Sequence, residues 1–177
     1  MWGGITGGEI TKYLGQGAKL SGMPEAKARE EEKRIFGGLL QQSGTESPAQ
    51  LRRELRTLMD KHAGVYRTGQ SMQEGLDKVG ELRRRFRKIV IQDKSRIYNS
   101  NLIQALETEN MLELAEVLLL SGLAREESRG GHARTDRPKR DDEDFLAHSM
   151  VYYTGSTPRL SYKPVTITTW RPVERKY

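Results

Sequence analysis

Three long segments with apolar residues at helical spacing lie between residues 47 and 127, and they constrain the fold more than any other feature. We predict Ser47 as the N-cap of the first segment, with Pro48 in the first helical position and Gln50 completing a capping box. Its apolar face carries Leu51, Leu55, Leu58, Met59 and His62. This spacing predicts an amphipathic helix with one buried stripe.

The second and third segments repeat this pattern. Ser71 and Glu74 predict a second capping box, and a third helix is predicted to start near Asn99. The apolar stripe of the second helix comprises Leu76, Val79, Leu82, Phe86, Ile89 and Val90. The third helix is expected to bury Ile103, Leu106, Met111, Leu114, Ala115, Leu118 and Leu119.

These segments predict a mainly α fold, with an antiparallel three-helix bundle similar to a spectrin repeat over residues 46–127. We expect helices in residues 1–45, one over the first fifteen residues and one that begins at Pro24. Residues 128–177 are expected to form a loop followed by an extended or β-hairpin arm.

The arm is predicted from a change of periodicity late in the chain. The stretch "FLAHSMVYY" at residues 145–153 is expected to end as a strand, and "GSTPRL" is expected to turn. In the following stretch Val165, Ile167 and Thr169 alternate on one side, as in a second strand.

The composition removes several classes of site. The chain has 177 residues and no cysteine, which excludes disulfides, thiolate zinc sites and thiol catalysis. No apolar run approaches the roughly 20 residues of a membrane-spanning helix, and the N-terminus does not resemble a signal peptide. The formal net charge of +6 is compatible with an anionic partner such as nucleic acid.

Other motifs favour structural roles. The stretch "GGITGG" lacks the lysine of a phosphate loop and follows no strand, so we predict a helix that packs closely on a neighbour. In "ELRRRFRKIVIQDKSR" the basic residues alternate with the apolar stripe, as on a solvated helix face. His62 is expected to be buried and hydrogen-bonded. We find no candidate catalytic residue or metal ligand set in the chain itself.

The segment from Arg125 to Asp144 holds six basic and seven acidic residues, so its net charge is −1. A tail that binds nucleic acid does not neutralise itself in this way, because each internal acid competes with the phosphates. We expect Gly130 and Gly131 to end a helix with φ above zero. Beyond them, a cationic cluster suited to carboxylates or phosphates is predicted from Arg129, His132 and Arg134.

The same segment closely resembles the C-terminal region of the flavoprotein subunit of succinate dehydrogenase and fumarate reductase. The family pattern is matched by Asn110, Met111, Ala115, Ala124, Arg125, Glu127, Ser128, Arg129, Gly130, His132, Arg134, Asp136, Pro138, Arg140, Asp141 and Asp142. Upstream, a second family segment is matched by Leu55, Met59, Gly64, Val65 and Arg67. The stretch "WGGITGGEITKYL" looks like the last helix of the family's FAD-binding domain.

The resemblance implies a parent enzyme that interconverts succinate and fumarate by hydride transfer with FAD. It also implies an iron–sulfur subunit, membrane anchor subunits and a peripheral position on the cytoplasmic face of the inner membrane. The family's flavin-binding and catalytic residues lie before residue 1, so we expect an artificial start at Met1 of an excised C-terminal piece. Such a piece is expected to bind no FAD tightly and to be inactive alone, and its exposed apolar surface is expected to favour self-association.

The resemblance also implies a place for the cationic cluster. Arg129, His132 and Arg134 are candidates for contact with the FAD-binding domain of the same parent chain, near the flavin; alternatively, they only cap a helix and bridge domains. Two other interpretations stay open: the C-terminal part of L-aspartate oxidase, adenylylsulfate reductase or another related flavoprotein, and a basic helical module that binds nucleic acid. The long tail after Asp141 favours succinate dehydrogenase over aspartate oxidase.

Overall fold

The structure is a computed structural model that describes residues 2–19 and 21–173. It is mostly helical with a small antiparallel two-stranded sheet, which confirms the predicted mainly α class. The chain forms two compact units, one up to Gly38 and one from Leu39. The predicted start at Met1 and the last four residues of the predicted arm lie outside the described residues.

The first unit contains the two predicted helices, α1 (Trp2–Gly15) and α2 (Glu25–Glu32), followed by a π-helical turn, Lys33–Gly38. The glycines of "GGITGG" lie inside α1 and form no phosphate-binding loop. Every described side chain of α1 is exposed, and no other part of the described chain comes within 4 Å of a Cβ built at Gly4 or Gly8. The packing of this helix on a close neighbour stays a prediction.

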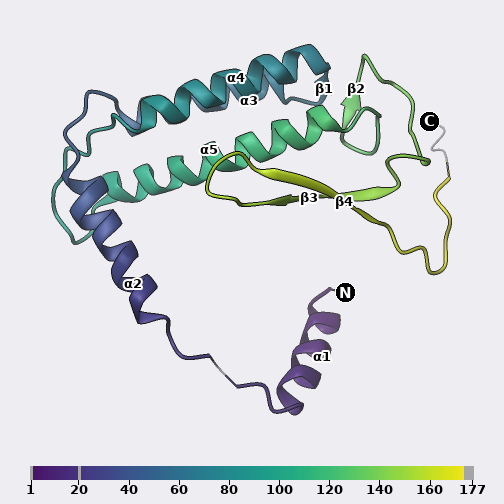
Figure 1. Cartoon of the computed structure of the whole chain (residues 1–177), viewed down its shortest axis with the longest axis horizontal. Coiled ribbons are helices and arrows are strands. Elements are labelled where there is room, and N and C mark those ends of the chain that lie inside the picture. The colour runs from purple at the N-terminus through teal and green to yellow at the C-terminus, as the bar shows by residue number, and fades with distance from the viewer. Residues whose placement is uncertain (1, 20, 174–177) are drawn as a thin grey trace. The chain divides into compact units, whose positions relative to one another are not determined.

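The second unit begins with a 3₁₀ turn, Leu39–Gln41, and is built on α3 (Pro48–His62), α4 (Gly69–Phe86) and α5 (Ser100–Ala124). Each of these three helices packs against the other two. Figure 1 shows α4 and α5 running side by side, with α4 beginning near the point where α5 ends. This arrangement places both of these helix ends beside the loop that follows α5.

Apolar side chains at the predicted spacing form the core of the second unit. The buried residues of α3 and α4 include Leu51, Leu55, Leu58, Met72, Val79, Leu82 and Phe86. His62 is also buried, and its Nδ1 lies 2.9 Å from the Ser71 carbonyl oxygen, which confirms its predicted environment. Beyond α4, Ile89 is buried in a bridge with Glu46.

The predicted buried face of α5 is only partly right. The helix buries Leu102, Ala105, Thr108, Leu112, Ala115, Leu119 and Gly122. Ile103, Leu114 and Leu118, which were expected inside, are 56%, 67% and 42% exposed. The helix carries apolar residues on more than one face, so its periodicity does not decide which face packs inward; contact with α3 and α4 decides.

Two of the predicted helix starts need correction. Ser47 is the N-cap of α3, but its side chain makes no capping hydrogen bond, and the Gln50 amide donates to Glu54 Oε1 at 3.0 Å. The N-cap of α4 is Thr68, whose hydroxyl accepts from the Ser71 amide at 3.1 Å, so the box predicted at Ser71 is wrong. α5 starts beside Asn99, as predicted, and the Asn99 side chain caps it by accepting from the Leu102 amide at 2.8 Å.

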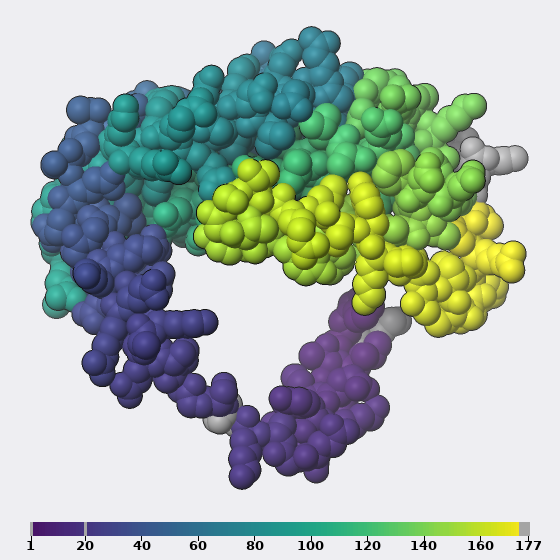
Figure 2. All heavy atoms as spheres, in the orientation of Figure 1, coloured from purple at the N-terminus to yellow at the C-terminus, as the bar shows by residue number. Residues whose placement is uncertain are grey.

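Short strands complete the second unit. β1 (Tyr66–Arg67) pairs in parallel with β2 (Ala133–Arg134), whereas β3 (Ala147–Tyr152) and β4 (Arg159–Pro164) form an antiparallel hairpin. Figure 2 shows the hairpin covering part of the surface of α5, which β3 contacts. The expected alternation at Val165, Ile167 and Thr169 falls after β4, whose last residue, Pro164, pairs with Ala147 at the start of β3.

No helix within the described residues combines the length and the apolar character that crossing a bilayer requires.

Candidate functional site

The candidate site is the segment from Arg125 to Asp142, which we call the motif loop. It leaves the end of α5 and is anchored by β2, whose parallel partner β1 directly precedes α4. The helix expected to run to Gly130 ends at Ala124, so that prediction is wrong. Gly130 does have a positive φ of 57°, in the tight turn where the backbones of Arg129 and His132 exchange two hydrogen bonds.

A buried carboxylate organises the first half of the motif loop. The Glu127 side chain has no exposed surface, and its Oε1 accepts hydrogen bonds from the guanidinium groups of Arg125 and Arg129. Its Oε2 accepts from the Asp141 amide at 2.8 Å and from Arg129 at 3.0 Å. Burial opposes the charge, but hydrogen bonds from Arg129, the Asp141 amide and Arg125 outweigh it and keep the pKa of Glu127 below its ordinary value.

Arg129 links Glu127 to the far end of the motif loop. Its Nη2 donates to the Asp141 carbonyl at 2.9 Å and to Asp142 Oδ1 at 2.7 Å. Asp142 also accepts from Arg140 at 2.7 Å. The positive charge of Arg129 is therefore neutralised inside the loop, and 27% of its side chain remains exposed.

Arg134 and Asp136 form a second, separate ion pair that joins two helix ends. The guanidinium of Arg134 meets Asp136 in a two-point contact with both distances at 2.8 Å. Its Nη1 also donates to the carbonyls of Leu123 and Arg125 at 3.2 Å, at the C-terminal end of α5. The other end of the pair reaches α4, because Asp136 Oδ2 accepts from the Gly69 amide at 2.9 Å. We call this pair the helix-end clamp.

The polarity of the helix-end clamp matches both helices. A cation lies at the negative C-terminal end of α5 and a carboxylate lies at the positive N-terminal end of α4. The pKa of Asp136 lies far below its ordinary value, first because of the hydrogen bonds from Arg134 and also because of the Gly69 amide. A Cβ at Gly69 would lie 2.8 Å from Arg134 Nη2, so only glycine leaves room for the clamp.

His132 lies among cationic side chains, but its own ring is neutral. Its Nε2 is 3.2 Å from the Arg125 carbonyl oxygen and its Nδ1 is 3.3 Å from Arg67 Nη1. The ring therefore donates through Nε2–H and accepts at Nδ1, which requires the neutral form. Burial lowers the pKa of His132, and the charges of Arg67, Arg134 and Arg125 lower it further, against the hydrogen bond to the carbonyl.

Ser128 fixes the path of the backbone through the loop. Its hydroxyl accepts from the Arg134 amide at 2.8 Å and lies 2.8 Å from the Arg137 carbonyl. Its own amide donates to the Lys139 carbonyl at 3.0 Å. The motif loop is thus ordered from within, by hydrogen bonds that join residues up to fourteen positions apart.

The three predicted contact residues therefore lie in one loop but in different environments. Arg134 is 4% exposed and fully engaged, whereas Arg129 and His132 are half-buried and reach the surface. Sequence reasoning missed the organising roles of Glu127, Asp136 and Arg67. The acids lie two residues from the arginines that they bind, but the charged background offers so many such pairs that spacing alone does not select these.

The described residues contain no cluster of three or more histidine or acidic side chains arranged to hold a metal ion.

Comparison with known proteins decides the family. Residues 52–177 match the family model described as the C-terminal region of fumarate reductase flavoprotein. The chain belongs to this family. It is 42% identical over 154 residues to the fumarate reductase flavoprotein subunit of Mycobacterium tuberculosis, covering 86% of this chain and 26% of that protein. It is also 42% identical over 136 residues to the succinate dehydrogenase flavoprotein subunit of Rickettsia bellii, covering 76% of this chain and 23% of the relative.

Solved structures agree with this family. The fold matches the E. coli quinol fumarate reductase with a TM-score of 0.84 and 35% identity, over 94% of this chain and 29% of that one. Adenylylsulfate reductase from Archaeoglobus fulgidus shares the fold, with a TM-score of 0.70 at 20% identity. The chain spans about a quarter of the length of the curated relatives that it matches.

Proposed function

We propose that this chain is the C-terminal helical part of a succinate dehydrogenase or fumarate reductase flavoprotein, whose complete form interconverts succinate and fumarate with FAD. The match of residues 52–177 to the family model carries this proposal. Because the chain spans about a quarter of its relatives, the flavin chemistry belongs to the remaining part of the parent chain. We expect the chain alone neither to bind FAD tightly nor to turn over substrate.

The proposed role of the chain is packing and positioning. Residues 1–45 would supply the terminal helix of the FAD-binding domain and a linker helix, residues 46–127 an antiparallel three-helix bundle, and residues 128–177 the motif loop and the arm. The mutual packing of α3, α4 and α5 supports the bundle. The exposure of Trp2, the first described residue of α1, at 80% supports burial of that helix in a larger domain.

The outer surface of α5 offers a further docking face for the FAD-binding domain. Leu114 is 67% exposed and lies in a groove between α5 and the β3–β4 hairpin, where Val117 and Tyr153 also line the surface. A large apolar patch of this kind is costly to leave in water. The same surface would drive self-association of the isolated chain.

The motif loop is proposed as the part that meets the FAD-binding domain near the flavin. Arg129 and His132 would supply the surface groups, and Arg134 would hold the loop from behind through the helix-end clamp. In this arrangement a neutral His132 offers hydrogen bonds without adding charge, while the internal acids keep Arg129 in place.

The parent complex would include an iron–sulfur subunit and membrane anchor subunits, with the flavoprotein peripheral on the cytoplasmic face of the inner membrane. The nearby structures that carry the fold include quinol fumarate reductase, which supports such an assembly. The identity of 42% to fumarate reductase and succinate dehydrogenase subunits favours this proposal over L-aspartate oxidase or adenylylsulfate reductase, the latter sharing only the fold. The acid partners of Arg129 and Arg134 argue against a nucleic-acid-binding module.

A chimera tests the proposed function. The matching C-terminal region of the E. coli fumarate reductase flavoprotein subunit, which is 39% identical, is replaced by this chain. Flavin content and fumarate reduction by a reduced viologen dye are then measured in the assembled complex. We expect flavin binding and activity to be retained, whereas the subunit truncated before this region should have neither. A chimera that folds and holds flavin but cannot reduce fumarate would contradict the proposal.

A further inference from the structure

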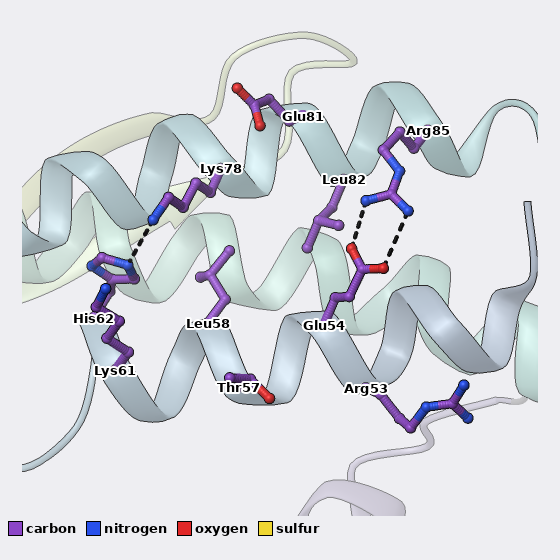
Figure 3. A pocket seen from close by; sticks show the side chains of 10 residues that line it. All are labelled: Arg53, Glu54, Thr57, Leu58, Lys61, His62, Lys78, Glu81, Leu82 and Arg85. Carbon is purple, nitrogen blue, oxygen red and sulfur yellow. Dashed lines mark hydrogen bonds and ion pairs between the residues drawn. The ribbon is translucent and has the colours of Figure 1, made fainter.

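A groove runs between α3 and α4 on the side away from α5, and the proposed function makes no use of it. Figure 3 shows its side chains, with α5 lying behind the two helices. The groove has a volume of about 490 Å³. It is lined by Arg53, Glu54, Thr57, Leu58, Lys61, His62, Lys78, Glu81, Leu82 and Arg85.

One end of the groove is closed by ion pairs. Arg85 donates to Glu54, with Nη2 3.2 Å from Oε1, and also meets Glu46 at 2.9 Å. Two carboxylates therefore share one guanidinium; Glu46 lies outside the groove and Arg53 lines it beside Glu54, so the charges of these four groups cancel.

The opposite end carries uncompensated positive charge. Lys78 Nζ lies 3.3 Å from His62 Nε2, and His62 Nδ1 lies 2.9 Å from the Ser71 carbonyl oxygen. Neither Lys61 nor Lys78 makes an ion pair with a carboxylate of the described residues. In Figure 3 the Glu81 carboxylate points away from both lysines.

The floor between the two ends is apolar. The side chains of Leu58 and Leu82 face each other across the helix pair (Figure 3). Glu54 and Lys61 are seven residues apart on α3, so the groove is about 10 Å, or two helical turns, from one charged end to the other. The aliphatic stems of the two lysines extend this apolar surface.

We propose that this groove docks an amphipathic helix of a partner protein, with acidic side chains against Lys61 and Lys78 and an apolar side chain over Leu58 and Leu82. Charge complementarity at the lysine end fixes the direction of the docked helix. An open groove of two turns suits helix-in-groove recognition, whereas a small ligand needs a site that encloses most of its surface.

Selection from a displayed library of helical peptides of about four turns tests the proposal on the full chain. The enriched peptides are expected to carry acids at one end, followed by an apolar residue. Their affinity is measured by fluorescence anisotropy with the chain and with the Lys61→Glu/Lys78→Glu variant, which should bind at least about tenfold more weakly. The control variant Arg56→Glu/Arg84→Glu has the same net charge, changes exposed arginines outside the groove, and should bind as the original chain does.

Two results would overturn the proposal: no enrichment of acidic amphipathic helices, or equal loss of affinity in both double variants, which would indicate non-specific charge attraction. Binding of decanoate that depends on Lys61 and Lys78, without enrichment of such helices, would also overturn it in favour of a small amphipathic anion. If the charge reversal unfolds the chain, Lys61→Gln/Lys78→Gln removes the same charges with less repulsion. Thermal melts establish that each variant is folded before binding is measured.

Discussion

Two charge-rich regions of this protein use their arginines in opposite ways. In the motif loop, Arg134 is 4% exposed and Arg129 is held by a carboxylate with no exposed surface. On the surface of α3 and α4, Arg85 pairs with Glu46 and Glu54 but keeps 36% of its side chain exposed, and Arg84 is exposed. Both regions are rich in arginine, but the burial of the acids differs.

This difference separates two roles of ion pairs. A buried carboxylate such as Glu127 cannot lose its arginine partners without leaving a charge away from water, so the pairing specifies the path of the loop. An exposed pair is screened by water and salt and contributes little to folding, which leaves surface charges available for partners. The motif loop is therefore ordered by its own buried ion pairs, whereas the charges of the α3–α4 surface remain open to solvent.

The largest expected effect is that of Glu127→Ala. The substitution leaves Arg125 and Arg129 without their shared partner, and we expect the free energy of unfolding to fall by about 3–5 kcal/mol in urea denaturation followed by circular dichroism. The matched control is Glu126→Ala, whose carboxylate is exposed and pairs with Arg137 at 3.3 Å. The control should lose less than about 1 kcal/mol. Equal losses in the two variants would remove the distinction between buried and exposed pairs.

Two glycines in α4 test how closely this helix packs against its neighbours. A Cβ at Gly75 would lie 2.8 Å from His62 Cβ and 3.2 Å from Leu119 Cδ2, so Gly75→Ala should destabilise the fold by about 1–3 kcal/mol. At Gly80 the nearest atom is Arg84 Nη1 at 3.8 Å, and Gly80→Ala should stabilise the helix by about 0.5–1 kcal/mol. Thermal melts measure both, and shifts of the same sign would show that the close approach of the helices does not limit position 75.

Removal of Arg85 is expected to have a smaller effect. Because its ion pairs are more than a third exposed, Arg85→Ala should lower the free energy of unfolding by less than about 1 kcal/mol. The loss should shrink further in high salt, where surface charges are screened. Arg129→Ala, measured in the same way, should cost more and depend less on salt, since it removes one of the two guanidinium groups that pair with the buried Glu127. A loss of unfolding free energy that depends more on salt in Arg129→Ala than in Arg85→Ala would contradict the distinction between buried and exposed ion pairs.

The smallest expected effect is a pH dependence from His132. Its pKa is lowered in the folded chain, first by burial and then by the charges of Arg67, Arg134 and Arg125. The unfolded state therefore binds more protons, and this contribution to stability is complete above about pH 6.5 and is lost as the pH falls below it. In His132→Gln the urea midpoint of unfolding should vary less with pH across this range. An unchanged pH dependence would show that other groups cause it. The carboxylates of Glu127 and Asp136 have lowered pKa values and lose their contribution only at more acidic pH.

Local patterns in the sequence predicted the helices of the second unit because each pattern reports on neighbouring residues. The stripes of α3 and α4, the start of α5 near Asn99 and the buried His62 are of this kind. The inward face of α5 was missed because several faces of that helix are apolar, and only contact with α3 and α4 chooses among them.

The motif loop shows a second feature that local patterns do not predict. The sequence predicted its positive φ at Gly130 and its internal charge balance, but not which acid meets which arginine. The partners are fixed by long-range geometry: Asp136 is chosen by the start of α4 and Glu127 by the return of the chain at Asp141. The span of the second strand, β4, was also misplaced, because its pairing with β3 covers Arg159–Pro164 and not the alternating residues that follow.

The helix-end clamp is the central structural claim, and a double-mutant cycle on Arg134 and Asp136 tests it most directly. Unfolding free energies are measured for Arg134→Ala, Asp136→Ala and the double variant in the full chain. If the pair joins the end of α5 to the start of α4, the two substitutions should be coupled by about 1–3 kcal/mol. Additive effects, within about 0.5 kcal/mol, would contradict the account and show that each residue acts independently.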